Sequence, residues 1–147
     1  MRGILVGYDG SGHSAKALEW AAREAAVRNE DLTVVHVCQE KPCAWGEARP
    51  SGDAWLAEAR ELAEEQADKA LARAGAGLSR PRVTVRAIRG LPAEELLSAA
   101  TDADMLVVGA RGAGGFRKLL LGSVSCHIAH HAHCPVVVIP DDEGGEP

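Results

Sequence analysis

The sequence predicts an α/β domain with a doubly wound, five-stranded parallel sheet and helices on both faces. Short apolar runs rich in valine and isoleucine alternate with longer segments whose apolar residues recur every three or four positions. The short runs are apolar on consecutive residues, which is typical of strands buried on both faces of a sheet. Regular alternation of such strands with helices indicates a parallel sheet covered on two sides. The chain has 147 residues and is 46% apolar, so it can form one domain with a substantial core.

The expected strands are residues 3–7, 32–38, 83–88, 105–109 and 136–139. Ser11 or Ser14 can cap the first helix. Asp53 can cap a second helix that runs to about residue 74, with an apolar stripe that includes Leu62. A third helix begins at Pro92, since proline is favoured in a first helical turn. A fourth begins near residue 123 and ends before residue 135.

These elements form one expected domain over residues 1–140, and the acidic, glycine-rich residues 141–147 are expected to be a disordered tail. Right-handed crossovers favour the strand order 3-2-1-4-5. In that order the winding reverses between strands 1 and 4, and ligands bind at such a switch point beside the carboxyl ends of the strands. The loops after Gly7 and Val108 are therefore the expected position of a binding site.

Composition argues against several classes of protein. The net charge is -5 and the sequence pI is about 5.7, whereas a nucleic-acid-binding domain is usually basic. The sequence contains no run of 18 apolar residues, the length needed to span a membrane. Its first apolar stretch ends at Asp9, too early for a signal peptide. The four cysteines form no CxxC pair. We therefore expect a cytoplasmic protein with free thiols.

A glycine-rich segment follows the fourth strand, with five glycines in residues 109–122. Its exposed amides can form an anion-binding concavity. Ser123 and Ser125 stand where the next helix begins, so their hydroxyls and the free amides of the first turn can meet a phosphate. Arg111, Arg117 and Lys118 add positive charge. A flexible turn with a serine cap would give the same pattern, and the residues alone leave both interpretations open.

The spacing of this segment, Gly109-x2-Gly112-x9-Gly122-Ser123, resembles the glycine motif of the ATP-binding universal stress proteins. Residues 6–11, 17–21, 34–37 and 131–139 resemble other segments of that family, in the same order. The resemblance covers the chain except residues 40–52 and the tail. It implies an adenine nucleotide ligand, ATP with Mg²⁺, and a homodimer joined through residues 136–139.

The resemblance also implies roles for individual residues. Asp9 would bind the ribose or adenine, and the backbone of Val37 would meet the adenine edge. Gly10 would let the nucleotide lie close to the first turn. The remaining contacts would be made to phosphates, by Gly109, Gly112 and Gly115 at the α- and β-phosphates and by Gly122, Ser123, Val124 and Ser125 at the terminal phosphates. Arg111, whose charge was noted above, is counted with these residues as a candidate for the site.

The sequence lacks the motifs of several other nucleotide-binding proteins. A P-loop would need a lysine followed by serine or threonine after the glycines, and a dinucleotide fingerprint would need its glycines after the first strand. An adenylating enzyme would need a different loop at residues 9–14. We expect a regulatory or stress-response protein without a catalytic residue or metal site, since no general base is evident beyond Asp9. A slow ATPase or phosphotransferase remains an alternative, as does a metal or redox sensor that uses the cluster of Cys126, His127, His130 and His131.

Overall fold

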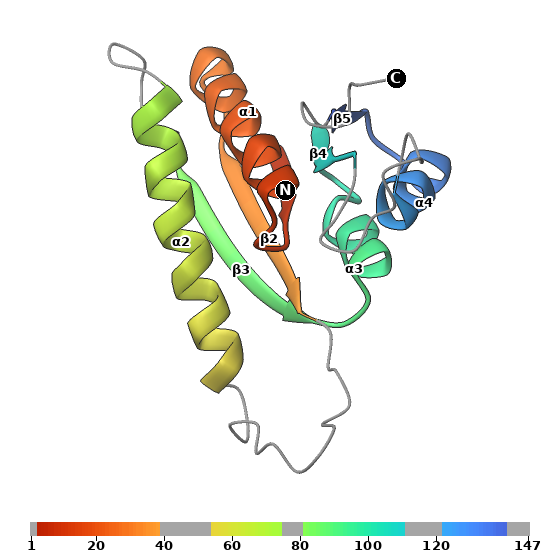
Figure 1. Ribbon diagram of the computed structural model, residues 1–147. Helices are drawn as coiled ribbons and strands as arrows, with labels where there is room; N and C mark the ends of the chain where they lie inside the picture. The colour runs from red at the N-terminus through yellow and green to blue at the C-terminus, as the bar shows by residue number, and fades with distance from the viewer. Residues whose placement is uncertain (1–2, 39–53, 75–80, 111–121, 141–147) are drawn as a thin grey trace, which may run out of the picture.

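The computed structural model describes residues 3–38, 54–74, 81–110 and 122–140. Strands and helices alternate from one end of the described chain to the other (Figure 1). The elements are β1 (Ile4–Tyr8), α1 (Gly12–Arg28), β2 (Leu32–Cys38), α2 (Ala54–Ala74), β3 (Val83–Arg89), α3 (Pro92–Ala99), β4 (Met105–Gly109), α4 (Ser123–His131) and β5 (Val136–Ile139).

The strands form one five-stranded sheet in the order β3-β2-β1-β4-β5, and every neighbouring pair is parallel. The predicted fold and strand order are confirmed. The first strand lies one residue later than predicted, because Tyr8 continues the ladder opposite His36. The phenol ring of Tyr8 then packs edge-on against the imidazole of His36, with the ring centroids 5.5 Å apart. The third strand extends to Arg89, opposite Cys38.

Alternate side chains of the strands enter two separate cores, as the period of two requires. On one face, Ile4, Val6 and Val34 pack with α1 and α2. On the other, Leu5, Val35 and Leu106 pack with α3 and α4. Figure 1 shows α1 and α2 on one side of the sheet and α3 and α4 on the other. The sheet is therefore covered on both faces, as predicted.

The residues predicted at the starts of α1 and α3 are found there. Ser11 is the N-cap of α1, and its Oγ accepts the amide proton of Ser14 at 3.2 Å. Pro92 occupies the first turn of α3. The proposed cap of α2, Asp53, lies outside the described residues, as does the tail at residues 141–147.

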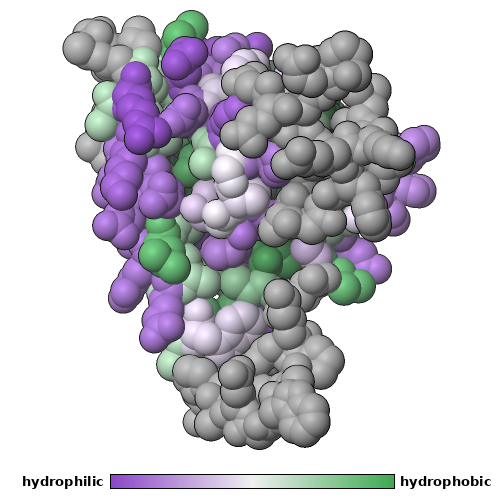
Figure 2. Space-filling model, in the orientation of Figure 1, coloured by the Kyte–Doolittle hydropathy of each residue, from purple (hydrophilic) through white to green (hydrophobic). Residues whose placement is uncertain are grey.

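The second helix packs on the sheet through small residues, and its outer surface is mainly hydrophilic (Figure 2). Ala63, Ala67 and Ala70 are its buried residues. Leu62 was expected in the buried stripe, but 57% of its surface is exposed. The prediction is wrong because α2 lies close to the sheet, where its contacts are made by alanines. The larger side chain of Leu62 lies outside this row of contacts.

Candidate functional site

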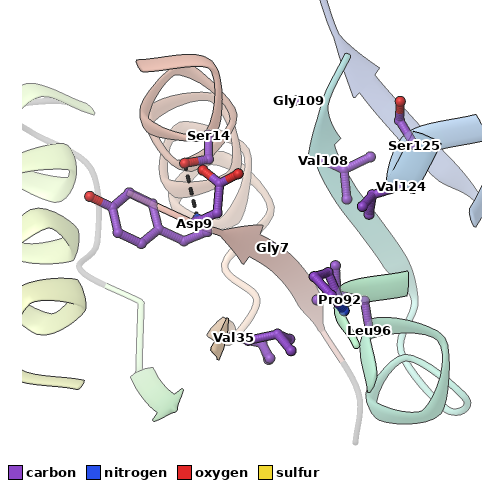
Figure 3. A pocket seen from close by; sticks show the side chains of 12 residues that line it. Gly7, Asp9, Ser14, Val35, Pro92, Leu96, Val108, Gly109, Val124 and Ser125 are labelled. Atoms are coloured by element: carbon purple, nitrogen blue, oxygen red, sulfur yellow. Dashed lines mark hydrogen bonds between the residues drawn. The ribbon is translucent and has the colours of Figure 1, made fainter. Parts of the chain in front are cut away.

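A pocket opens at the carboxyl ends of the three central strands, where the winding of the sheet reverses. Its cavity volume is about 90 Å³, and it is open to solvent on one side. Asp9 and Ser14 lie at the α1 side of this pocket, while Val124 and Ser125 lie at the start of α4 (Figure 3). The full lining consists of Gly7, Tyr8, Asp9, Ser14, Val35, Val37, Pro92, Leu96, Val108, Gly109, Val124 and Ser125.

Backbone groups of β2 and β4 face this pocket because alternate residues of a parallel strand bond to opposite neighbours. The amide of Leu32 and the carbonyl of Cys38 bond on the β3 side of β2. Val37 therefore turns its peptide groups toward β1, just past the last register pair of the two strands, Tyr8 with His36. The carbonyl of Val37 is thus placed to accept a hydrogen bond from a ligand in the pocket.

The same alternation applies to β4 on the other side of the pocket. The amides of Leu106 and Ala110 donate to carbonyls of the β5 side, at 2.9 and 2.8 Å. Gly109 therefore turns its peptide groups toward β1 and the crevice. Because β1 ends between them, Val37 and Gly109 flank the pocket from the two neighbouring strands.

The turn between β1 and α1 is held by a short network of hydrogen bonds. The amide of Asp9 donates to Ser14 Oγ at 3.1 Å, and Asp9 Oδ1 accepts from the amide of Ser11 at 2.8 Å. Gly10 has φ of 87°, a conformation that side chains rarely adopt, so glycine is favoured at this position. The network fixes the exposed Asp9 side chain at the mouth of the pocket.

The start of α4 presents backbone amides at the opposite side. The first intrahelical bond runs from the amide of Cys126 to the carbonyl of Gly122 at 2.9 Å. The amides of Ser123, Val124 and Ser125 precede it and are therefore the free donors of the first turn. Such a turn attracts anions through these donors and through the helix dipole.

The two serines of this turn differ in environment. Ser123 is exposed. Ser125 is 2% exposed, and its hydroxyl donates to the carbonyl of Ala110 at 2.7 Å. The Ser123 hydroxyl is thus available at the surface, while the Ser125 hydroxyl joins α4 to the end of β4.

Comparison with known proteins identifies the family. Residues 1–140 match the model of the universal stress protein family. The chain belongs to the universal stress protein family. A universal stress protein of Mycobacterium tuberculosis is 34% identical over 147 residues, which cover 99% of this chain and 50% of that protein. Another, from Mycolicibacterium smegmatis, is 36% identical over 151 residues, which cover 96% of this chain and 49% of that protein. The chain therefore spans about half the length of these curated relatives.

Solved universal stress proteins have the same fold. One structure, a universal stress protein in complex with cAMP, superposes with a TM-score of 0.68 at 26% sequence identity. The match covers 95% of this chain and 96% of the other. Universal stress protein UspA from Lactobacillus plantarum superposes with a TM-score of 0.66 at 25% identity, covering 94% and 97% of the two chains.

The structure brings together most of the residues that the sequence predicts for the site of this universal stress protein. Five of them line the pocket, namely Asp9, Val37, Gly109, Val124 and Ser125. Gly10 adjoins the first of these, and Gly122 and Ser123 begin α4. Arg111, Gly112 and Gly115 lie outside the described residues.

The apolar wall of the pocket was not predicted from the sequence. Val35, Leu96 and Val108 resemble ordinary core residues in the sequence, yet they line the pocket. Gly7 is also part of the wall, and a Cβ added there would lie 2.9 Å from Leu96 Cδ1. The one signal in the sequence is a glycine inside a buried strand, which marks a close approach of another group.

The described ionisable groups of the pocket are acidic or neutral. Burial raises the pKa of the Tyr8 phenol, and the nearby charge of Asp9 raises this pKa further, so the phenol stays protonated at neutral pH. Among the lining residues that the structure describes, no lysine, arginine or histidine is present. In this part of the chain, attraction for an anion therefore comes from helix and backbone amides.

No helix of the described segments has the length and apolarity needed to cross a bilayer.

Proposed function

We propose that this universal stress protein binds an adenine nucleotide in the pocket at the switch point of the sheet, and that ATP, carried with Mg²⁺, is its ligand. The observation that carries the proposal is the pairing of an apolar pocket with the free amides at the start of α4. Leu96 and Val108 supply an apolar surface for a base, while the first turn of α4 supplies donors for phosphate. The solved relative with cAMP, itself an adenine nucleotide, supports the same class of ligand.

The proposed roles divide along the pocket. The Val37 carbonyl accepts from the exocyclic amino group of adenine, and Asp9 bonds the ribose or the base. Gly10 lets the nucleotide approach the turn, and Gly109 lies along the α-phosphate. Toward the other end of the ligand, the glycine-rich segment surrounds the phosphates through Arg111, Gly112 and Gly115, and the α4 start holds them through Gly122, Ser123, Val124 and Ser125. Mg²⁺ would be carried mainly by the phosphate oxygens of ATP and by water, since Asp9 is assigned to the ribose or base.

We further propose that the nucleotide serves regulation in a cytoplasmic stress response, and that the protein works as a homodimer through β5. The three described cysteines are free thiols, which suits a reducing compartment. As the last strand of the sheet, β5 has one edge without a neighbouring strand among the residues that the structure describes. Its four residues are apolar and half-buried, so pairing with a second copy would cover them.

A calorimetric titration tests nucleotide binding. Gly122 has φ of -76° and ψ of 175°, an extended conformation that valine also adopts. Gly122→Val therefore needs no change of backbone conformation, and we expect its side chain to occupy part of the buried space that the phosphate approaches. A hydrogen bond to a charged group contributes about 1.5–3 kcal/mol, so we expect affinity for ATP to fall by roughly ten- to a hundredfold or more.

Gly12→Val is the matched control. Gly12 is the first residue of α1, and no atom lies within 4 Å of an added Cβ there. It should bind ATP as the parent does, while AMP and cAMP should lose less affinity than ATP in Gly122→Val. Circular dichroism checks the fold of each variant. The proposed phosphate site is refuted if folded Gly122→Val binds ATP as tightly as the parent.

A further inference from the structure

The outer face of α4 carries four metal-binding side chains that the nucleotide pocket does not use. Cys126, His127, His130 and His131 are all exposed. The helix turns its other side inward through Ser125 and Ile128, which are buried. The four residues fall within two turns of one helix, at spacings of three and four that place side chains next to each other. We call them the Cys/His face of α4.

One pair on this face has the separation that a metal ion can bridge. Cys126 Sγ lies 3.9 Å from His130 Nδ1. Zinc-type bonds of about 2.3 Å to sulfur and about 2.0 Å to nitrogen put the two ligands roughly 3.5 Å apart in a tetrahedron and at most about 4.3 Å apart. The observed distance lies between these limits, so an ion can bridge Cys126 and His130 once the imidazole turns its Nδ1 away from the carbonyl oxygen of Cys126, 2.8 Å distant.

The hydrogen bond of His130 determines which protons must move when a metal ion binds. Its Nδ1 lies 2.8 Å from the carbonyl oxygen of Cys126, so this nitrogen carries the ring proton in the metal-free protein. On binding, the thiol of Cys126 releases its proton to solvent and its sulfur forms the bond to the metal. The ring proton of His130 moves through solvent from Nδ1 to Nε2, and Nδ1 donates its lone pair. One net proton is therefore released for each ion bound.

The second pair on the same face lies beside the first. The rings of His127 and His131 have centroids 4.6 Å apart and planes inclined by 38°. Among the residues that the structure describes, no three histidine, cysteine or carboxylate side chains converge on one point. The Cys/His face is thus an open site with two protein ligands, where solvent completes the coordination.

The other described thiols differ from Cys126 in a way that matters for metal binding. Burial raises the pKa of the thiol of Cys38 and that of Cys134, although a hydrogen bond from the backbone of Leu106 partly offsets the effect at Cys134. Both thiols therefore resist forming the thiolate that metals require. Cys126 is the exposed member of the described set and has an imidazole beside it.

We propose that the outer face of α4 binds a late transition-metal ion, such as Zn²⁺ or Co²⁺, through Cys126 Sγ and His130 Nδ1. A thiolate with imidazole favours these borderline ions over Mg²⁺ and Ca²⁺, which prefer oxygen ligands. The site is separate from the nucleotide pocket, and its occupancy does not depend on whether the protein binds ATP.

Titration with Co²⁺ tests the site, because cobalt–thiolate bonds absorb in the near ultraviolet and cobalt–imidazole bonds do not. The protein is used without a histidine tag, reduced with a phosphine, and freed of metal with a chelator. We expect one equivalent of Co²⁺ to produce the thiolate band, Zn²⁺ to displace it, and binding to weaken as pH falls. Cys126→Ser should remove the band, and His130→Ala should weaken Co²⁺ binding roughly tenfold or more.

Two variants provide matched controls. Cys134→Ser removes a thiol elsewhere, and His13→Ala removes a histidine from α1; each should bind Co²⁺ as the parent does. His127→Ala with His131→Ala should retain the thiolate band. The proposal is overturned if Cys126→Ser keeps the band, if no band forms in the parent, or if only the His127 and His131 variant loses cobalt. All substituted side chains on α4 are exposed, so circular dichroism should confirm native folds.

Discussion

Ser125 Oγ donates a hydrogen bond of 2.7 Å to the backbone carbonyl of Ala110, fifteen residues earlier in the chain. The same carbonyl also accepts the amide proton of Gly122. The first turn of α4 is thereby fixed to the residue that follows β4. Because free amides of that turn are the proposed phosphate donors, this contact determines where they point. In the proposed site, Ser123 would touch the phosphate, whereas Ser125, two positions later, would fix the direction of the amides that bind it.

Ser125→Ala and Ser123→Ala should separate these two effects. Ser125→Ala removes a buried hydroxyl, but the Ala110 carbonyl keeps its bond from Gly122, so we expect a loss of about 1–2 kcal/mol in the free energy of unfolding. Ser123→Ala changes an exposed side chain and should stay within about 0.5 kcal/mol of the parent. Its affinity for ATP should nevertheless fall about tenfold.

Urea denaturation and calorimetric titration measure both quantities on the same samples. Equal stability losses in the two variants would contradict the positioning role of Ser125. An unchanged ATP affinity in Ser123→Ala would remove its hydroxyl from the proposed phosphate contacts.

Gly7→Ala should reduce the space available to the base. The added Cβ would lie 2.9 Å from Leu96 Cδ1 and 3.2 Å from Leu96 Cδ2, so Leu96 must move. On its other sides Leu96 packs within a close-packed core, so the pocket that it lines is the space open to it. We expect a modest loss of about 1 kcal/mol in stability and a loss of ATP affinity of about tenfold or more, both from the displaced side chain.

A substitution at Leu96 tests whether displacement of this side chain causes the loss of affinity in Gly7→Ala. Leu96→Val shortens the side chain that the new methyl group displaces, so adding it to Gly7→Ala should restore part of the affinity. The pair is compared with both single variants in a double-mutant cycle, with titration of ATP as the readout. Strictly additive losses would show that the Gly7–Leu96 contact does not shape the pocket.

The fold was predictable because local patterns were strong at each element. The apolar run at residues 105–109 could be little other than a buried strand, and Pro92 marked the start of α3 in advance. Leu62 was placed wrongly because periodicity does not show how close a helix lies to a sheet. That distance is set by the alanines of α2, which pack where a larger side chain would not fit.

The polar part of the candidate site was predictable for a different reason. Asp9 and Gly109 follow strands at the predicted switch point, so topology alone brings them together. The apolar wall was not predictable, since Val35 and Leu96 become pocket residues only because β1 ends beside them. The different environments of Ser123 and Ser125 could have been inferred from Ile128, which lies three residues after Ser125 on the same buried face.

The proposed dimer can be tested at the backbone of β5. The carbonyls of Pro135 and Ile139 accept bonds from β4, so alternation turns the peptide groups of Val136 and Val138 to the outer edge. Val138→Pro removes an outward amide and should be tolerated in the monomer, because proline is found at edge positions of this kind. We expect sedimentation velocity to show a dimer for the parent and a monomer for Val138→Pro at micromolar concentration.

Val137→Pro serves as the contrasting variant at the next residue. Its amide faces β4, opposite Val107, so this substitution should lower the stability of the monomer itself by about 3 kcal/mol. A monomeric parent would rule out the dimer, and a fully dimeric Val138→Pro would place the dimer contact on another surface.

Alkylation by iodoacetamide should distinguish the described cysteines by rate. The thiolate is the reactive form, and burial raises the pKa of Cys38 and of Cys134 above the ordinary thiol range. At pH 8 both should react more slowly than the exposed Cys126, and their rates should keep rising with pH after that of a small free thiol has levelled off. A raised pKa means that the folded state holds the thiol proton more tightly than the unfolded state does. The contribution of the Cys38 and Cys134 thiols to the stability of the folded protein is therefore present below the pKa of the unfolded state. This contribution is lost as pH rises through the folded pKa.

Peptide mass mapping over a pH series measures the alkylation rate of each cysteine. Urea-unfolded protein is the reference, in which the differences between the cysteines should vanish. Faster labelling of Cys38 or Cys134 than of Cys126 in the folded protein would contradict the burial that the structure assigns to them.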